Sequence, residues 1–190
     1  RMTQLSGGSS VPLLAFSILM VFVFALAAVS LEKQSAYEAV YRPSGQDLTF
    51  SLLGALGLIA GCVLSFRGSI AQMLVSLLGL LAGLSLGAGA VLRWKEKKPS
   101  AAFSVFVVLF YVAKLFRDFR HWEINPAILD YCFSLFAMIA FMLASYHAGA
   151  FSFERGARRR LAFYSLLGVL FGAVSLAVAQ LPELVIYAGR

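Results

Sequence analysis

Charged side chains are scarce in this 190-residue chain, where they make up 13% of the sequence. A soluble globular domain carries about twice that share. The hydrophobic share is 61%, which excludes a disordered chain and argues against an ordinary cytosolic enzyme. The net charge of +7 comes from short basic segments between apolar runs rather than from a separate basic domain. A nucleic-acid-binding role is therefore excluded as well.

Metal-ligating and catalytic residues are also few. The two cysteines and two histidines cannot form a dense zinc-ligand set, so we expect neither a metal site nor a cofactor. The zinc-protease, serine-hydrolase, P-loop and dinucleotide-binding motifs are all missing. These absences lean against an enzyme. Cys62 and Cys132 fall near the same side of their apolar segments, which leaves a disulfide open as an alternative to buried thiols.

Long apolar runs dominate what remains. A membrane-spanning helix needs about 20 apolar residues, and the runs lack the alternation of a membrane β-barrel. The sequence therefore predicts an all-α polytopic membrane protein, with a single domain over residues 1–190. Six transmembrane helices are expected, at 11–31, 48–66, 69–92, 101–116, 126–150 and 161–179. The apolar stretch at 184–188 is compatible with the start of a seventh.

The basic residues predict an orientation in the cell membrane. Ten of the 16 Lys and Arg residues fall on the side of the predicted membrane that carries loops 93–100 and 151–160. Positively charged loops stay in the cytoplasm, so both termini are predicted outside. These loops could also bind anionic lipid head groups, although topology alone explains them. In the segment before Asp47, helical spacing of Tyr37 and Tyr41 predicts a short interfacial helix.

Small residues recur every four positions, a spacing that lets membrane helices approach closely. The predicted helix-packing residues are Gly57 and Gly61, then Gly79, Gly83 and Gly87, and finally Gly168 and Gly172. Contacts within the chain are the simplest interpretation. A homo-oligomer or a membrane protein partner is the alternative.

Two ionisable residues, Lys114 and Asp130, fall inside predicted spans, where a charge costs several kcal/mol. Consecutive antiparallel helices would bring them to similar depth, so they could pair. Other polar residues share their helix faces or the adjoining hairpin: Tyr111, Asp118, His121, Ser134 and Arg67. Together they predict an outward-facing pocket for a small polar or zwitterionic solute. In the alternative, Lys114 extends to the surface and Asp130 stabilises the start of its own helix.

Three functions follow from these patterns. The first is a small-solute binding or transport protein that uses the predicted pocket. The second is a non-catalytic assembly, regulatory or sensor subunit that binds partners through glycine-rich faces. The third is a membrane enzyme that acts on a lipid-linked substrate through His121, Asp118 and Asp130.

Overall fold

The computed structural model describes the backbone of residues 10–41, 44–66, 69–122 and 128–188. Within these ranges, side chains are described except at 10–13, 39, 120–122, 128–131 and 178–188. The secondary structure of these ranges is entirely helical. Its elements are α1 (Ser10–Ser30), α2 (Tyr37–Val40), α3 (Gly45–Leu64), α4 (Ile70–Trp94), α5 (Ala101–Trp122), α6 (Ile128–Ala150), a 3₁₀ turn η1 (Phe151–Phe153) and α7 (Arg158–Ala188).

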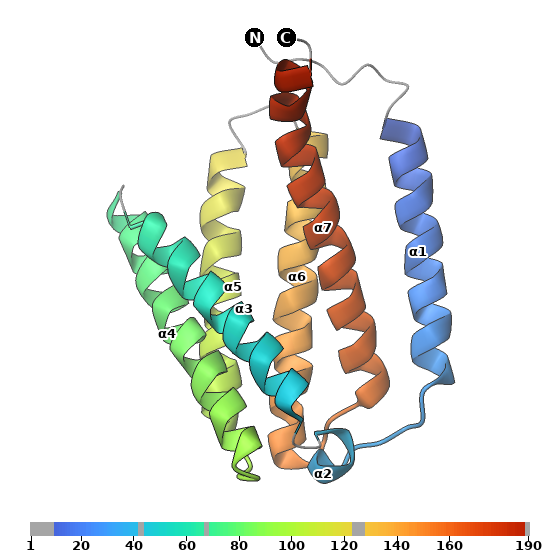
Figure 1. Ribbon diagram of the computed structural model, residues 1–190, viewed down its shortest axis with the longest axis vertical. Helices are drawn as coiled ribbons and strands as arrows, with labels where there is room; N and C mark the ends of the chain where they lie inside the picture. Colours follow the sequence, from blue (N-terminus) through green and yellow to red (C-terminus); the bar gives the residue numbers. More distant parts are fainter. Residues whose placement is uncertain (1–9, 42–43, 67–68, 123–127, 189–190) are drawn as a thin grey trace.

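The long helices run up and down alternately, so that α1 begins and α7 ends at the same end of the bundle (Figure 1). The short helix α2 lies at the other end, which we call the α2 end. The basic segments that follow α4 and α6 lie at this end too. The main packing follows chain order from α3 to α7, whereas α1 packs on α7. The long helices therefore form a series in which each packs on the next, and α1 and α3 stand at its two ends.

Among the residues with described side chains, four helical segments are long and apolar enough to cross a membrane: Gly45–Leu64, Ile70–Trp94, Cys132–Phe153 and Arg158–Ala177. In α1, the apolar part with described side chains is the shorter segment Leu14–Ser30. Helix α5 extends beyond its predicted end at residue 116 to Trp122, and its second half carries Lys114, Arg117 and Asp118. These charges distinguish α5 from the four apolar spans.

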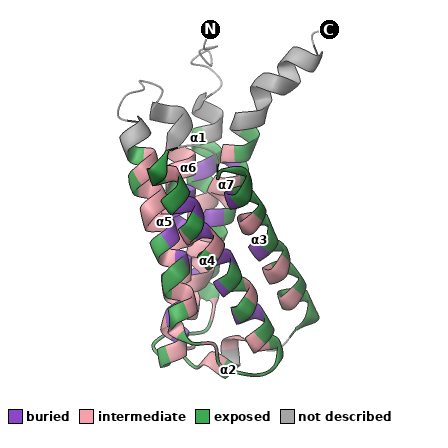
Figure 2. Ribbon diagram, turned by 90° about the vertical axis from the view of Figure 1, so that its left-hand side faces the viewer, coloured by how far each residue is buried: buried purple, intermediate pink, exposed green. Residues whose placement is uncertain are grey.

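The interior consists mainly of small residues, and large apolar side chains cover the outside. Ala82 and Ala90 are almost fully buried, and Ser76 and Ser85 lie inside as well. Many leucines, valines and phenylalanines are exposed instead, and Figure 2 shows this division along the helices. Small residues inside and large apolar ones outside are expected where lipid replaces water, because tight backbone approach then drives helix association.

Glycines of α4 form its closest contacts with α3. A methyl group added at Gly83 would lie 2.5 Å from Ile59 Cγ1 and 3.2 Å from the Ala55 carbonyl oxygen. One added at Gly79 would overlap the thiol of Cys62 and lie 2.8 Å from Phe110 of α5. The α4 face predicted from the glycine spacing therefore packs within the chain.

The remaining predicted packing glycines divide into two groups. Gly87 is in ordinary contact with α3, and Gly168 and Gly172 lie against Phe141 of α6. Gly57 and Gly61 differ from the expectation, because nothing lies within 4 Å of a methyl group added at either. They occupy the face of α3 that points away from α4.

The first turn of α3 contains Asp47, but the residue that caps this helix is Ser44, and its side chain makes no capping hydrogen bond. Asp47 is directed toward α4 instead, as described below.

Cys62 is buried in the core cluster with Val75, Ala82, Val107 and Phe110, and it forms no disulfide.

Candidate functional site

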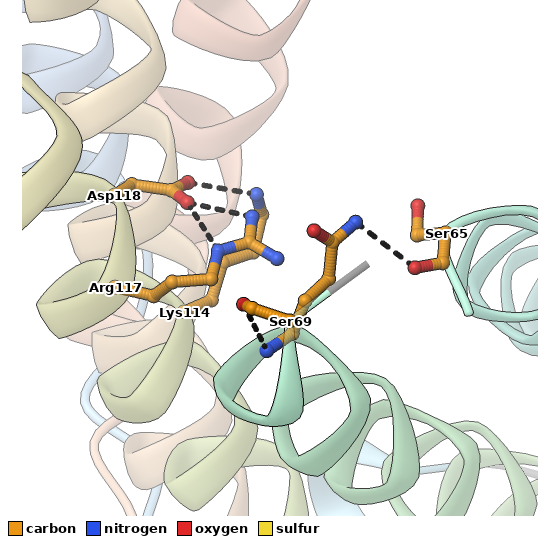
Figure 3. Close-up of polar contacts among 6 residues, drawn as sticks. Ser65, Ser69, Lys114, Arg117 and Asp118 are labelled. Atoms are coloured by element: carbon orange, nitrogen blue, oxygen red, sulfur yellow. Dashed lines mark hydrogen bonds and ion pairs between the residues drawn. The ribbon is translucent and has the colours of Figure 1, made fainter. Parts of the chain in front are cut away.

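The predicted polar site lies near the end of the bundle opposite α2, where α5 carries three adjacent charged groups (Figure 3). Lys114 Nζ lies 2.9 Å from Asp118 Oδ2. Arg117 donates to Asp118 Oδ1 from Nε at 2.8 Å and from Nη2 at 2.6 Å. One carboxylate therefore accepts from two cations, and the group retains one positive charge.

Helix α4 begins beside this charged group. Its N-cap residue Ser69 accepts a 3.4 Å hydrogen bond from the Gln72 amide, and Gln72 Nε2 donates to the Ser65 carbonyl at 3.0 Å (Figure 3). The second bond joins the start of α4 to the end of α3. The described charged side chains here therefore bind each other, and Ser69 and Gln72 bind the backbone at the adjoining helix ends.

The other predicted pocket residues are not all brought to the charged group. Tyr111 packs within the helical interior, where its ring stacks on Phe141 at a centroid distance of 6.0 Å. Ser134 is half-buried on α6. The side chains of His121, Asp130 and Arg67 lie outside the described residues, so the predicted pairing of Lys114 with Asp130 stays a prediction.

The charged group yields a stability prediction. Asp118→Ala should lower the free energy of unfolding by about 1–2 kcal/mol, because it leaves two cations without a shared acceptor. Lys114→Gln should lower it by less than about 0.5 kcal/mol, since Arg117 still neutralises the carboxylate. Thermal unfolding of the detergent-purified variants measures both. Equal losses for the two variants would show that Asp118 is not the central residue of the group.

A second polar group lies at the α2 end and centres on Arg93, in the last turn of α4. Its Nη2 donates to Ser51 Oγ of α3 at 3.1 Å. Asp47 Oδ2 is 3.4 Å from Arg93 Nε, close enough for an ion pair, although Nε makes no hydrogen bond in the buried site. The guanidinium also lies over the ring of Tyr41, 5.4 Å from its centroid. Arg93 therefore joins α3, α4 and the segment that follows α2.

Aromatic side chains anchor α2 to the bundle. The ring centroids of Tyr37 and Tyr41 lie 5.0 Å apart. The rings of Tyr41 and Phe151 pack edge to face, and Phe151, in η1, is fully buried. Burial raises the pKa of Tyr41 to about 12, against the opposing effect of Arg93. Burial likewise raises the pKa of Tyr37, whose buried hydroxyl has no hydrogen-bond partner. Both phenols therefore stay protonated near neutral pH and can donate hydrogen bonds.

Behind α2 lies a cavity of about 90 Å³, which we call the serine pocket. Its polar lining comprises Tyr37, Tyr41, Arg93 and five serines, Ser85, Ser100, Ser104, Ser145 and Ser152. Among its lining residues only Arg93 is charged. Three of the serine hydroxyls donate to backbone carbonyls, namely Ser85 to Leu81, Ser145 to Phe141 and Ser152 to Pro99. Their oxygen lone pairs remain able to accept from a ligand.

A larger pocket of about 570 Å³ with a strongly charged lining adjoins the serine pocket. Its charged residues are Glu38, Arg93, Glu96, Lys97, Lys98 and Glu154. Tyr37, Tyr41 and Arg93 line this charged pocket as well as the serine pocket. These three side chains therefore form the wall shared by the two cavities.

The serine pocket could not be predicted from the sequence. The serines are spread from residue 85 to residue 152, and each by itself resembles an ordinary helix-packing residue. Two sequence features point only indirectly to this pocket. One is the predicted short helix near Tyr37 and Tyr41, which α2 confirms, and the other is the position of Arg93 at a helix end.

The described residues contain no group of three or more His, Cys, Asp or Glu side chains that could hold a metal ion. No protein-family model matches the chain, and neither a curated protein nor a solved structure matches it.

Proposed function

We propose that this chain is a six-span membrane protein that binds a small amino or hydroxy carboxylic acid in the serine pocket, as part of solute binding or transport. The observation that carries the proposal is the combination of one guanidinium with several hydroxyl acceptors in a single cavity. In this proposal α1 and α5 are spans in addition to the four strongly apolar helical segments.

The chemistry of the lining supports a ligand with two different ends. Arg93 and the protonated phenols of Tyr37 and Tyr41 supply donors for a carboxylate. Ser85 and Ser145 already donate to the backbone, so their oxygens suit a ligand that donates, such as an ammonium or a hydroxyl group. A ligand that carries only an anion would leave these acceptors unused.

The volume of the serine pocket supports a small ligand. At about 10–15 Å³ per water-sized group, a cavity of about 90 Å³ admits roughly six to nine non-hydrogen atoms. Alanine and lactate each have that size.

The proposed orientation follows the basic segments at the α2 end. Positively charged loops are retained in the cytoplasm, so the serine pocket would open toward the cytoplasm. This places the ligand at the end of the bundle opposite the pocket expected from Lys114 and Asp130. Transport would then need a second state of the bundle that opens toward the other side.

Four matched probes test the proposal by thermal unfolding of the full chain in detergent. Alanine and lactate carry both a carboxylate and a donor, propionate lacks the donor, and alaninamide lacks the carboxylate. At 100 times its dissociation constant a ligand adds about 2.7 kcal/mol, which should raise the melting temperature by about 5–10 °C. We expect this increase with alanine or lactate, and a smaller one with propionate.

Variants then locate the binding site. Arg93→Gln should remove the ligand-induced increase, whereas Lys95→Gln, an exposed change that also removes one positive charge two residues further along the chain, should retain it. Ser145→Ala should weaken binding of lactate more than that of propionate. An increase that survives Arg93→Gln, or no response to any of the four probes, would reject the proposal.

The assembly-subunit alternative has its own observation in the open face of α3. Gly54, Gly57 and Gly61 have no neighbour within 4 Å of an added methyl group, and α3 packs mainly on α4. Small residues on an open face would allow close approach of another helix. Gly57→Leu should then dissociate a complex in detergent, as measured by light scattering, without loss of the folded chain.

A further inference from the structure

A third cavity lies between α5 and α6 at the α2 end, with a volume of about 690 Å³. One wall is apolar and includes Val105, Val108 and Leu109 of α5. Arg155, in the segment that leads into α7, and Arg160, in the first turn of α7, line the same cavity. We call it the α5–α6 groove.

We propose that the α5–α6 groove binds one anionic phospholipid, with an acyl chain along the apolar wall of α5 and the phosphate between Arg155 and Arg160. A volume of this size lies within the range of ligand sites. The groove meets the outer surface of the bundle, where Val105, Leu109 and Phe153 are exposed. A hydrophobic chain and a charged head group match its two parts.

The charges around the groove favour an anion. Within the described residues neither Arg155 nor Arg160 takes part in an ion pair. Arg160 also lines an adjoining pocket of about 390 Å³ that contains Lys33, Arg158 and Arg159. The start of α7 adds the positive end of a helix dipole. The phosphate would therefore enter a continuous basic surface.

The two remaining arginines of this segment have structural partners. Arg159 Nε donates to the Leu31 carbonyl at 2.6 Å, and Arg158 Nη1 donates to Gln34 Oε1 at 3.4 Å. Both hold the segment after α1 against α7. Topology alone would require only positive charge here, but the structure separates Arg158 and Arg159, which bond to the segment after α1, from Arg155 and Arg160, which line the α5–α6 groove.

The base of the groove is a close helix contact. A methyl group added at Gly149 of α6 would lie 2.8 Å from Ser104 Cβ of α5. The stacked rings of His147 and Tyr164, 5.4 Å apart, join α6 to α7 nearby. Close packing between α5, α6 and α7 therefore holds the helical part of the lining, and Arg155 is added by the short segment between η1 and α7.

Native mass spectrometry of the detergent-purified full chain tests the proposal with phosphatidylglycerol, phosphatidylcholine and glycerol phosphate. We expect phosphatidylglycerol to bind with a stoichiometry of one and more tightly than phosphatidylcholine. The double variant Arg155→Gln/Arg160→Gln should bind phosphatidylglycerol about 30-fold more weakly, because the loss of each arginine should weaken binding about fivefold. The matched variant Lys95→Gln/Lys97→Gln removes the same charge at the same end and should change binding less than twofold.

A second pair of variants tests the acyl-chain part without altering charge. Val105→Trp fills the groove from an exposed position and should reduce phosphatidylglycerol binding at least tenfold. Val169→Trp, an exposed position on α7 outside the groove, should have no such effect. The proposal is overturned if both pairs of charge variants weaken binding equally, if Val105→Trp leaves binding unchanged, or if glycerol phosphate binds as tightly as the lipid. Retention of lipid binding in Arg93→Gln would separate this site from the serine pocket.

Discussion

Gly83→Leu should strongly destabilise the folded chain and lower the amount that can be purified from the membrane. The first added carbon would lie 2.5 Å from Ile59 Cγ1 and 3.2 Å from the Ala55 carbonyl oxygen of α3. Ile59 can move, but Ala55 presents backbone, so α3 and α4 must separate to admit the side chain. We expect a loss of about 3 kcal/mol or more, at the upper end for overpacked sites. Size-exclusion chromatography and thermal unfolding of the purified variant measure it.

The matched control is Gly57→Ala on α3. Nothing lies within 4 Å of the added methyl group, and alanine is favoured over glycine within a helix by about 0.5–1 kcal/mol. This variant should be as stable as the parent or more so. A monodisperse Gly83→Leu protein with an unchanged melting temperature would contradict the close α3–α4 contact. If Gly83 served only to bind a partner protein, the Gly83→Leu chain would keep its melting temperature but lose the complex.

Phe151→Ala should cause the largest loss of stability at the α2 end. Its side chain is completely buried, fits against Gly156 and meets the ring of Tyr41 at 5.7 Å. Truncation of a buried phenylalanine costs about 3–5 kcal/mol, because the cavity that remains is only partly filled. Since Phe151 supports Tyr41, we also expect alanine and lactate to lose their effect on the melting temperature.

Phe153→Ala provides the comparison within the same 3₁₀ turn. Phe153 is 69% exposed, so its removal should change the free energy of unfolding in detergent by less than about 0.5 kcal/mol. Urea or thermal unfolding of both variants shows whether the loss of stability comes from the buried side chain of Phe151 or from the helix propensity of the turn. Similar losses for Phe151→Ala and Phe153→Ala would mean that Phe151 does not anchor α2.

Several features of this protein could be predicted from the sequence because their causes are local. Apolar length predicts the helices, since backbone hydrogen bonds must close within each segment in lipid. The predicted ranges 11–31 and 69–92 agree with α1 and α4 to within two residues. Tyrosine spacing predicted α2, and glycine spacing predicted the face of α4 that meets α3.

The candidate site could not be predicted in the same way. Lys114 and Asp130 were conspicuous as charges within apolar runs, and that signal led to the end of the bundle where Lys114 binds Asp118 on its own helix. The serine pocket draws Tyr41, Arg93 and Ser145 from separate elements. A serine has the same short-range sequence signature whether it faces a cavity, a neighbouring helix or its own backbone.

Composition and apolar length therefore predict the helical class, the positions of the long helices along the chain and the clustering of basic residues between them, although α5 and α7 extend beyond their predicted ends. Which glycines are in close contact, which arginines line the α5–α6 groove and where the hydroxyl groups gather depend on how the helices pack. The two sets of features differ in the sequence distance over which their causes act. Helix formation depends on neighbours within a few residues, whereas the serine pocket depends on how α2, α4, α5 and α6 pack against one another.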